Sequence, residues 1–254
     1  MKFDELDERM RVFETAYDLF VLPGMYFVAR LDGRSFTKLT KEVHAFDAPF
    51  DERFRDMMLE TTRHLMQNTG MRFVYGYTES DEISLLFHPD DQTFGRKVRK
   101  LDSVLAGEAS AKFTSLLAGH AVFDCRIAQL PNAATVVDYF RWRSEDAHRN
   151  ALNAHCYWML RKEGLGAAKA TAEIEGKSVA AKNELLHSRG INFNDLPAWQ
   201  RRGIGVLWES YDKHGQNPKT GESTVTLRRR LQTVMDLPLK DGYDAFVGRL
   251  LEIG

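Results

Sequence analysis

The sequence predicts an α+β protein with a ferredoxin-like βαββαβ core, built on an antiparallel sheet, and an appended helical and β-hairpin region. Between about residues 25 and 128, strand-like and helix-like apolar patterns follow one another in the order β-α-β-β-α-β. A long helical pattern follows Pro131, and a strand–turn–strand pattern occupies the last third. We therefore expect a core of residues 1–130 and an appended region of residues 131–254 packed on it.

The bulk composition is that of a globular protein: 43% hydrophobic and 28% charged residues over 254 positions. The net charge of −1 gives no overall basic field, so contacts with nucleic acid must use local basic patches. Two cysteines suggest no disulfide framework. The charged N-terminus lacks the apolar stretch of a signal peptide, and no apolar run is long enough to span a membrane. We therefore expect a cytoplasmic protein with no membrane partner.

The first elements follow from apolar spacing. Residues 1–20 predict a charged helix with five apolar residues at helical intervals. The next segment predicts a strand from Met25 to about Leu31, which ends at an Asp32-Gly33 turn. These two turn residues become candidates for the functional site below.

The rest of the core follows the same signals. One apolar face predicts a helix over residues 50–69, capped by Gly70. The stretches "MRFVYGY" and "EISLLF" predict two strands around an acidic turn. A second helix over about residues 93–118 and a strand in "AVFDCRIAQL" complete the βαββαβ order.

The appended region begins with a helical pattern that runs from after Pro131 to near Gly164. Later, "GIGVLWESY" and "STVTLRRRL" predict a β-hairpin. The intervening "DKHGQNPKTGE" supplies turn signals at Asn217-Pro218 and Thr220-Gly221.

Four carboxylates carry the most chemical information. Glu79, Asp81 and Glu82 share the acidic turn, and Asp32 ends the first strand. Because the first and third strands of a ferredoxin-like sheet are neighbours, Asp32 and Asp81 should converge at one edge. Two carboxylates suit Mg²⁺, which binds one or two of them together with substrate phosphates. Either motif alone is more often a solvated turn, but their joint placement favours a metal site.

Basic residues offer partners for phosphates. The stretch "GRKVRK" places Arg96, Lys97, Arg99 and Lys100 at the start of the second core helix, near the layer of the carboxylates, where they could hold triphosphate oxygens. A solvated helix end explains them equally well. Lys38, Lys41 and the run Arg228, Arg229, Arg230 are interpreted as surface charge.

Two weaker features lie on the long helix of the appended region. His148, His155 and Cys156 share a face but fit no compact zinc motif, so packing and surface polarity explain them better. Core packing is also the preferred explanation for the aromatic residues Phe140, Trp142, Tyr157 and Trp158, ahead of base stacking.

The chain resembles the tRNA(His) guanylyltransferases and their bacterial and archaeal "Thg1-like" relatives, which polymerise nucleotides in the 3′→5′ direction. The resemblance rests on "RLDGRSF", "HAFDAPFDERF", "YGYTESDEIS", "FDCRI", "DYFRWRSEDAHRNALN", "KNELL", "GINFN" and "RRGIGVLW", in the family's order over about residues 27–208. From about residue 209 onward we see no usable resemblance.

The resemblance implies a polymerase-palm core, a mechanism with two Mg²⁺ ions, ATP or GTP and other nucleoside triphosphates as substrates, tRNA as partner, and a homotetramer. By position, Asp32 and Asp81 would be the metal ligands, with the Gly33 carbonyl assisting and Glu82 as a supporting carboxylate. The nucleotide pocket would be lined by Arg34, Ser35, Phe36, Thr37 and Ser80. Lys182 would serve catalysis, and the RNA contacts would be His148, Asn150, Asn153 and Asn192.

Two departures resemble the Thg1-like branch. The eukaryotic "HINNLYN" is "HRNALNA" here, and the eukaryotic lysine of the "HNFAKP" element is Ala48. The implied activity is therefore templated 5′-end repair of tRNA, guanylylation of tRNA(His), or both, after activation of the 5′ phosphate. Two alternatives stay open: a nucleotide cyclase on the same palm, and a non-catalytic RNA-binding module.

Overall fold

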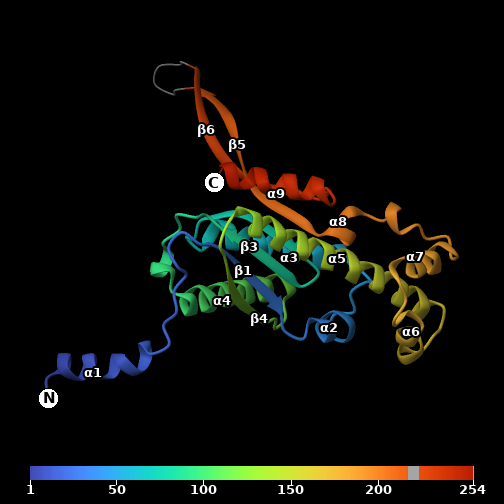
Figure 1. Cartoon of the computed structure of the whole chain (residues 1–254), viewed down its shortest axis with the longest axis horizontal. Coiled ribbons are helices and arrows are strands. Elements are labelled where there is room, and N and C mark those ends of the chain that lie inside the picture. The colour runs from blue at the N-terminus through green and yellow to red at the C-terminus, as the bar shows by residue number, and fades with distance from the viewer. Residues whose placement is uncertain (217–222, 254) are drawn as a thin grey trace.

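The computed structural model describes residues 1–216 and 223–253, and its centre is a six-stranded antiparallel sheet in the order β4-β1-β3-β2-β5-β6 (Figure 1). The strands are β1 (Tyr26–Gly33), β2 (Phe73–Glu79), β3 (Glu82–Phe87), β4 (Phe123–Leu130), β5 (Ile204–Gln216) and β6 (Ser223–Val234). The core helices are α3 (Glu52–Asn68) and α4 (Val98–Leu117). The predicted βαββαβ order and the adjacency of the first and third strands are confirmed.

Strand β1 extends two residues beyond its predicted end. Asp32 pairs with Glu82 of β3 and Asp124 of β4, and Gly33 pairs with Phe123. The predicted Asp32-Gly33 turn is therefore wrong, because both neighbouring strands keep these residues in the ladder. Asp32 consequently lies on the sheet itself, beside the turn between β2 and β3.

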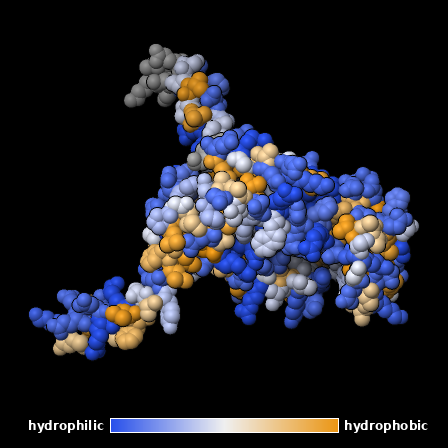
Figure 2. All heavy atoms as spheres, in the orientation of Figure 1, coloured by the Kyte–Doolittle hydropathy of each residue, from blue (hydrophilic) through white to orange (hydrophobic). Residues whose placement is uncertain are grey.

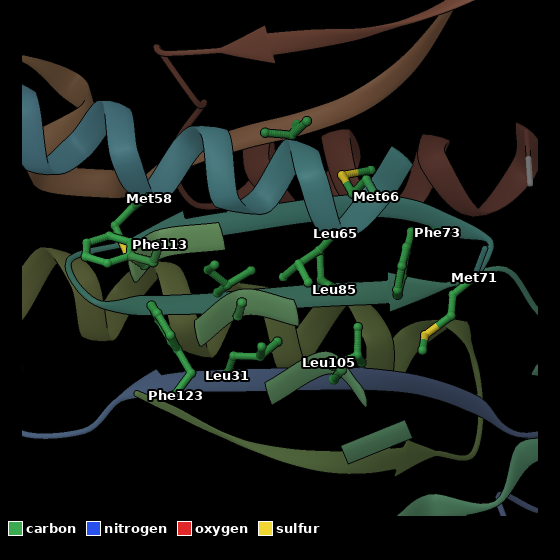
Figure 3. Packing of buried hydrophobic residues seen from close by; sticks show 14 of the residues in the cluster. Leu31, Met58, Leu65, Met66, Met71, Phe73, Leu85, Leu105, Phe113 and Phe123 are labelled. Atoms are coloured by element: carbon green, nitrogen blue, oxygen red, sulfur yellow. The ribbon is translucent and has the colours of Figure 1, made fainter. Parts of the chain in front are cut away.

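The two faces of the sheet bury separate apolar clusters. On one face, Leu31 and Leu85 pack under α3 and α4 against residues such as Leu65, Leu105 and Phe113 (Figure 3). On the other face, a second cluster contains Val28, Tyr75 and Leu86 with residues of α5 (Ala133–Lys162) and α9 (Asp241–Ile253). Alternation along the strands thus assigns Leu31 and its neighbour Asp32 to opposite faces.

Helix α4 begins later than expected. Phe94 and Gly95 have φ of 56° and 60°, so a short 3₁₀ segment, Thr93–Arg96, precedes the helix. Helix α3 ends as predicted, with Gly70 at φ +74° after its last turn.

The appended region adds helices and extends the sheet. Helix α5 confirms the predicted long helix, and it is followed by α6 (Ala167–Ile174), α7 (Val179–His187), a 3₁₀ turn at Phe193–Asp195 and α8 (Ala198–Arg202). Strands β5 and β6 confirm the hairpin, whose predicted Asn217-Pro218 and Thr220-Gly221 turn lies outside the described residues. Strand β5 pairs with β2, so both halves of the chain share one sheet.

Two segments project from the body. The outer ends of β5 and β6 form an arm, and helix α1 (Phe3–Thr15) points away from the sheet (Figure 1). Helix α1 buries none of its residues, and apolar side chains are visible along it in Figure 2. Phe3 is 77% exposed and Phe13 is 73% exposed. No described helix has the length and apolarity that crossing a membrane requires.

Candidate active site

The turn between β2 and β3 brings two of the predicted carboxylates together. The backbone N–H of Gly33, next to Asp32, donates to the carbonyl of Asp81 at 3.0 Å. Burial and the charge of Asp32 raise the pKa of Asp81 to about 6. Ser80 has φ of 48°, a left-handed conformation that a non-glycine residue adopts only when its surroundings impose it. The structure thus places Asp32 and Asp81 close together, where β1 ends beside the turn between β2 and β3.

Glu82 has a partner other than solvent or metal. Its Oε1 accepts a hydrogen bond from Nε of Arg143 on α5 at 2.8 Å, and Nε of Arg30 lies 3.9 Å from Oε2. Arg143 also donates to Asp146 at 2.9 Å. Burial raises the pKa of Glu82 and the two arginines oppose that rise. The predicted supporting carboxylate is therefore held in a buried ion pair that ties the turn to α5.

Protonation neutralises Glu79, the remaining acidic residue of the turn. Burial and the charge of Glu82 raise the pKa of Glu79 to about 8, so its carboxyl group is mostly protonated at neutral pH. The three acidic residues of the turn are thus accommodated separately: Glu79 by a proton and Glu82 by arginine, whereas Asp81 has no basic partner among residues 1–216 and 223–253. Asp81 and Asp32 are the two carboxylates left to bind a cation.

A cavity of about 250 Å³ opens beside the acidic turn. Its wall includes Phe36, Thr37, Glu79, Ser80 and Asp81. Aromatic side chains form much of the remaining wall: Phe46, Phe50, Phe54, Trp158 and Trp199. Its wall combines these aromatic rings with the carboxylates of the acidic turn and with Asp47, Asp51, Lys41 and Arg55. Such a mixed wall suits a ligand that has both an aromatic part and a part that carries phosphates.

Phe36 is positioned by a glycine. A Cβ on Gly33 would come within 2.5 Å of the Phe36 ring, so only glycine allows the ring to lie against the end of β1. Phe36 contacts Phe54, Phe113 and Phe123 in a cluster of edge and tilted rings. Of the other predicted pocket residues, Arg34 and Ser35 are exposed and do not line the cavity.

The basic cluster at the start of α4 lies elsewhere. Arg96 donates to the carbonyls of Asp91, Leu22 and Pro89, and Lys97 and Arg99 both bind Asp18. The neighbouring residues 19–22 precede the start of β1, whereas Asp32 stands at its other end, about 20 Å away along an extended strand. Lys100 is exposed one turn into the helix. The prediction that these four residues lie near the carboxylates of the same chain is therefore wrong.

The residues predicted for catalysis and RNA binding on the appended region are spread out. Asn150 lines the cavity and donates to Asp146 at 3.3 Å. His148 packs against Phe193 instead, and burial lowers its pKa. Asn192 is exposed and accepts from the N–H of Asn194. Asn153 is half-buried on α5.

Lys182 lies far from the acidic turn. Its carbonyl oxygen is 3.5 Å from Sγ of Cys156, and Cys156 follows Arg143 by 13 residues on α5, about 20 Å along the helix. The disfavoured zinc site is also absent from the part of the chain described, where no three His, Cys, Asp or Glu residues are grouped to hold a metal ion. Phe140 is buried as predicted, but Trp142 is 53% exposed, so core packing does not explain it.

Sequence reasoning missed Arg143, Arg30 and the cavity residues Phe50 and Trp199. The ion pair of Arg143 with Glu82 spans 61 positions, and no local pattern indicates it. One signal was present: "FRWRSED" places a second arginine two residues after Arg141, inside a helix whose apolar face is buried.

Family models match nearly the whole chain. The tRNAHis guanylyltransferase model matches residues 7–131, and the Thg1 C terminal domain model matches residues 134–237. The resemblance therefore continues past residue 209, contrary to our expectation. Among curated relatives, a probable tRNA(His) guanylyltransferase of Drosophila melanogaster is 34% identical over 74% of this chain and 68% of its own length. The tRNA(His) guanylyltransferase of Neurospora crassa is 32% identical over 76% and 69%.

Solved structures agree. A bacterial tRNA(His) guanylyltransferase (Thg1)-like protein in complex with GTP has a TM-score of 0.73 and 29% identity, covering 98% of this chain and 99% of its own. The tRNA(His) guanylyltransferase of Saccharomyces cerevisiae has a TM-score of 0.72 and 29% identity, covering 81% and 93%. With two family models that together match most of its length and a curated relative that is 34% identical, this chain belongs to the tRNA(His) guanylyltransferase family of nucleotidyltransferases.

Proposed function

We propose that this nucleotidyltransferase adds nucleotides to the 5′ end of tRNA in the 3′→5′ direction, in templated 5′-end repair, in guanylylation of tRNA(His), or in both. Family membership and the relatives solved with GTP and with ATP support the substrate classes. The observation that carries the proposal is the pair Asp32 and Asp81, of which Asp81 lines the cavity with its aromatic side chains. A passive RNA-binding module would gain nothing from such a pair, because two carboxylates repel the phosphates of RNA.

The donor set fits Mg²⁺. Asp32 and Asp81 are close enough for the charge of one to raise the pKa of the other, and the nearby arginines are engaged by Glu82. Mg²⁺ prefers one or two carboxylates completed by water and substrate phosphates. Asp32, Asp81 and the Gly33 carbonyl would hold the metal. When bound, two such ions supply charge stabilisation for an attacking oxygen and a leaving phosphate.

The chain's own residues bind and orient the reactants in this proposal. The cavity walls of Phe36, Phe46 and Trp199 accept a nucleobase and exclude water, which leaves the triphosphate at the Asp81 end. Thr37 and Ser80 stand at that end and offer hydroxyl groups to phosphate oxygens. The ion pair of Glu82 with Arg143 keeps the turn in place beneath them.

Two group transfers follow from this arrangement. First, an oxygen of the RNA 5′-monophosphate attacks the α-phosphorus of ATP, and pyrophosphate leaves. Second, the 3′-hydroxyl of the incoming nucleoside triphosphate attacks the activated 5′ phosphorus, losing its proton to solvent, and AMP leaves. The new 5′ end then carries the triphosphate of the added nucleotide.

We also propose that the chain works as an oligomer, a homotetramer by the family resemblance. Helix α1 supports association, because its apolar residues have no partner in the chain described. Large apolar side chains exposed on a soluble protein mark surfaces that bind other proteins.

The test uses a tRNA transcript that lacks its first nucleotide and carries a labelled 5′-monophosphate. Wild type should add the missing nucleotide with ATP, the four nucleoside triphosphates and Mg²⁺. Asp81→Asn should lose this activity while keeping its thermal transition, and Asp90→Asn, at an acid whose side chain is 82% exposed, should keep the activity. A label that wild type never extends would overturn the proposal. A cyclic nucleotide formed without RNA would instead indicate a cyclase-type reaction.

A further inference from the structure

A second hollow continues the cavity at the end away from the acidic turn. It has a volume of about 310 Å³ and is lined by Asp47, Ala48, Trp158, Arg161 and Lys162. Asp47, Ala48 and Trp158 line both hollows. Trp158 follows Arg143, the partner of Glu82, by 15 residues on α5, about 22 Å along the helix. The cavity therefore opens, away from the acidic turn, onto a surface formed by the last turn of α5.

Three cations surround this opening. Nζ of Lys41 lies 5.0 Å from the centre of the Trp158 ring and 5.8 Å from that of Tyr157. Arg161 stands 5.9 Å from the Tyr157 ring and donates to its hydroxyl group at 3.3 Å. Lys162 is exposed beside them. We call these residues, together with Trp158, the basic strip: Lys41, Trp158, Arg161 and Lys162.

The basic strip is not neutralised within the chain. Over residues 1–216 and 223–253, neither Lys41, Arg161 nor Lys162 lies within 4 Å of a carboxylate oxygen. The second hollow is lined by two cations, Arg161 and Lys162, and by one acidic residue, Asp47, while Lys41 lines the first hollow beside Trp158. Interpreting Lys41 as surface charge and Trp158 as core, as the sequence suggested, is therefore incomplete. Cations interleaved with aromatic rings are the pattern of surfaces that bind nucleic-acid strands.

The position of the basic strip indicates what it binds. In the proposed function, the triphosphate lies at the Asp81 end of the cavity, so the base of the same nucleotide points toward Asp47 and Trp158. A templating base must meet the edge of that incoming base, and its own backbone then runs past the opening. Phosphates of that strand need cations at this place, and the strip supplies them.

We propose that the basic strip binds the sugar-phosphate backbone of the RNA strand that pairs with the incoming nucleotide. Lys41, Arg161 and Lys162 contact phosphates, and Trp158 provides an apolar surface against the sugar or base. This inference rests on the proposed function and assigns it a template-strand contact, distinct from the triphosphate contacts at Asp81.

Salt-dependent binding tests the inference. Lys41→Gln, Lys162→Gln and the double variant are compared with wild type, and Lys112→Gln on α4 serves as the matched lysine control. Dissociation constants are measured for the 5′-truncated tRNA between 0.05 and 0.5 M salt. Each lost phosphate contact should reduce the magnitude of the slope of log K against log salt by about 0.7–0.9. Over the tenfold salt range, the loss of affinity caused by salt should therefore be roughly five- to eight-fold smaller in the variant than in wild type. The control should match wild type.

Two further measurements separate the sources of phosphate. Affinity for a non-hydrolysable Mg–triphosphate should be the same in wild type and in Lys162→Gln, because Lys162 lines the second hollow and not the nucleotide cavity. A tRNA that also lacks the template base and its 3′ single-stranded end should bind wild type and double variant alike. Unchanged slopes in the double variant, or a loss of triphosphate affinity instead, would overturn the inference. If wild type itself neither binds nor extends the truncated tRNA, the proposed function fails, and that result is distinct from equal slopes in an active protein.

Discussion

The ion pair of Arg143 with Glu82 should dominate the stability of the acidic turn. The Arg143 side chain is 6% exposed and that of Glu82 is 11% exposed, and their atoms are 2.8 Å apart. Arg143→Met removes the close cation and leaves Glu82 with only Arg30 at 3.9 Å. Breaking one partner of a buried pair costs about 3–5 kcal/mol, because the other charge stays desolvated. For a chain of this size the melting temperature should fall by roughly 6–20 °C.

The assay is urea or thermal unfolding of Arg143→Met, Glu82→Gln and the double variant, with added chelator to remove metal effects. If the pair interacts as described, the double variant should be less destabilised than the sum of the single variants by about 2 kcal/mol. Arg141→Met is the control, since Arg141 lies on the same helix with a 40% exposed side chain and more exposed ion pairs, to Glu145 and to Asp244 of α9. The reasoning is refuted if Arg143→Met is no more harmful than Arg141→Met, or if the two single effects add within about 0.5 kcal/mol.

Three more outcomes follow from the turn. Affinity for Mg²⁺, followed by tryptophan fluorescence, should rise about tenfold per pH unit below pH 6 and level off above it, because protons compete for Asp81; a flat profile from pH 5 to 7 would contradict this. In the presence of chelator, wild type should lose up to about 1.4 kcal/mol of stability per pH unit relative to Glu79→Gln between pH 4.5 and 8. The reason is that Glu79 of the native wild type keeps a proton that the unfolded chain has released. An equal pH dependence of both proteins would argue against the buried, protonated Glu79. Gly33→Ala should destabilise by about 1–3 kcal/mol and weaken triphosphate binding by displacing Phe36, whereas wild-type affinity in that variant would show that the ring has room to move.

Much of the fold followed from the sequence because its signals are local. Period-two apolar runs, together with Gly70 after one helix and Pro131 before another, determine the order of elements, and that order places Asp32 beside Asp81. The misplaced basic cluster has a topological reason. Strand β3 runs away from the acidic turn, from Glu82 to Phe87, so the segment after it starts at the opposite ends of the strands. Reading strand direction as well as element order would have placed Arg96 correctly.

The rest of the site depends on contacts that no local pattern encodes. Arg143 meets Glu82 across 61 positions, and Asn150 reaches the cavity only because α5 crosses the sheet. The end of β1 was misjudged for a similar reason, since partners on both sides keep Asp32 and Gly33 extended against their turn preference.

The pairing of β2 with β5 has a consequence for how the molecule must be made. Tyr75, Gly76, Tyr77 and Thr78 obtain one set of ladder partners from residues 204–207, which are synthesised more than 120 positions later. A nascent or truncated chain that ends near residue 131 therefore presents β2 as a bare, apolar edge, the template on which foreign strands add. We therefore expect fragments cut at that boundary to aggregate unless the missing half is supplied in trans.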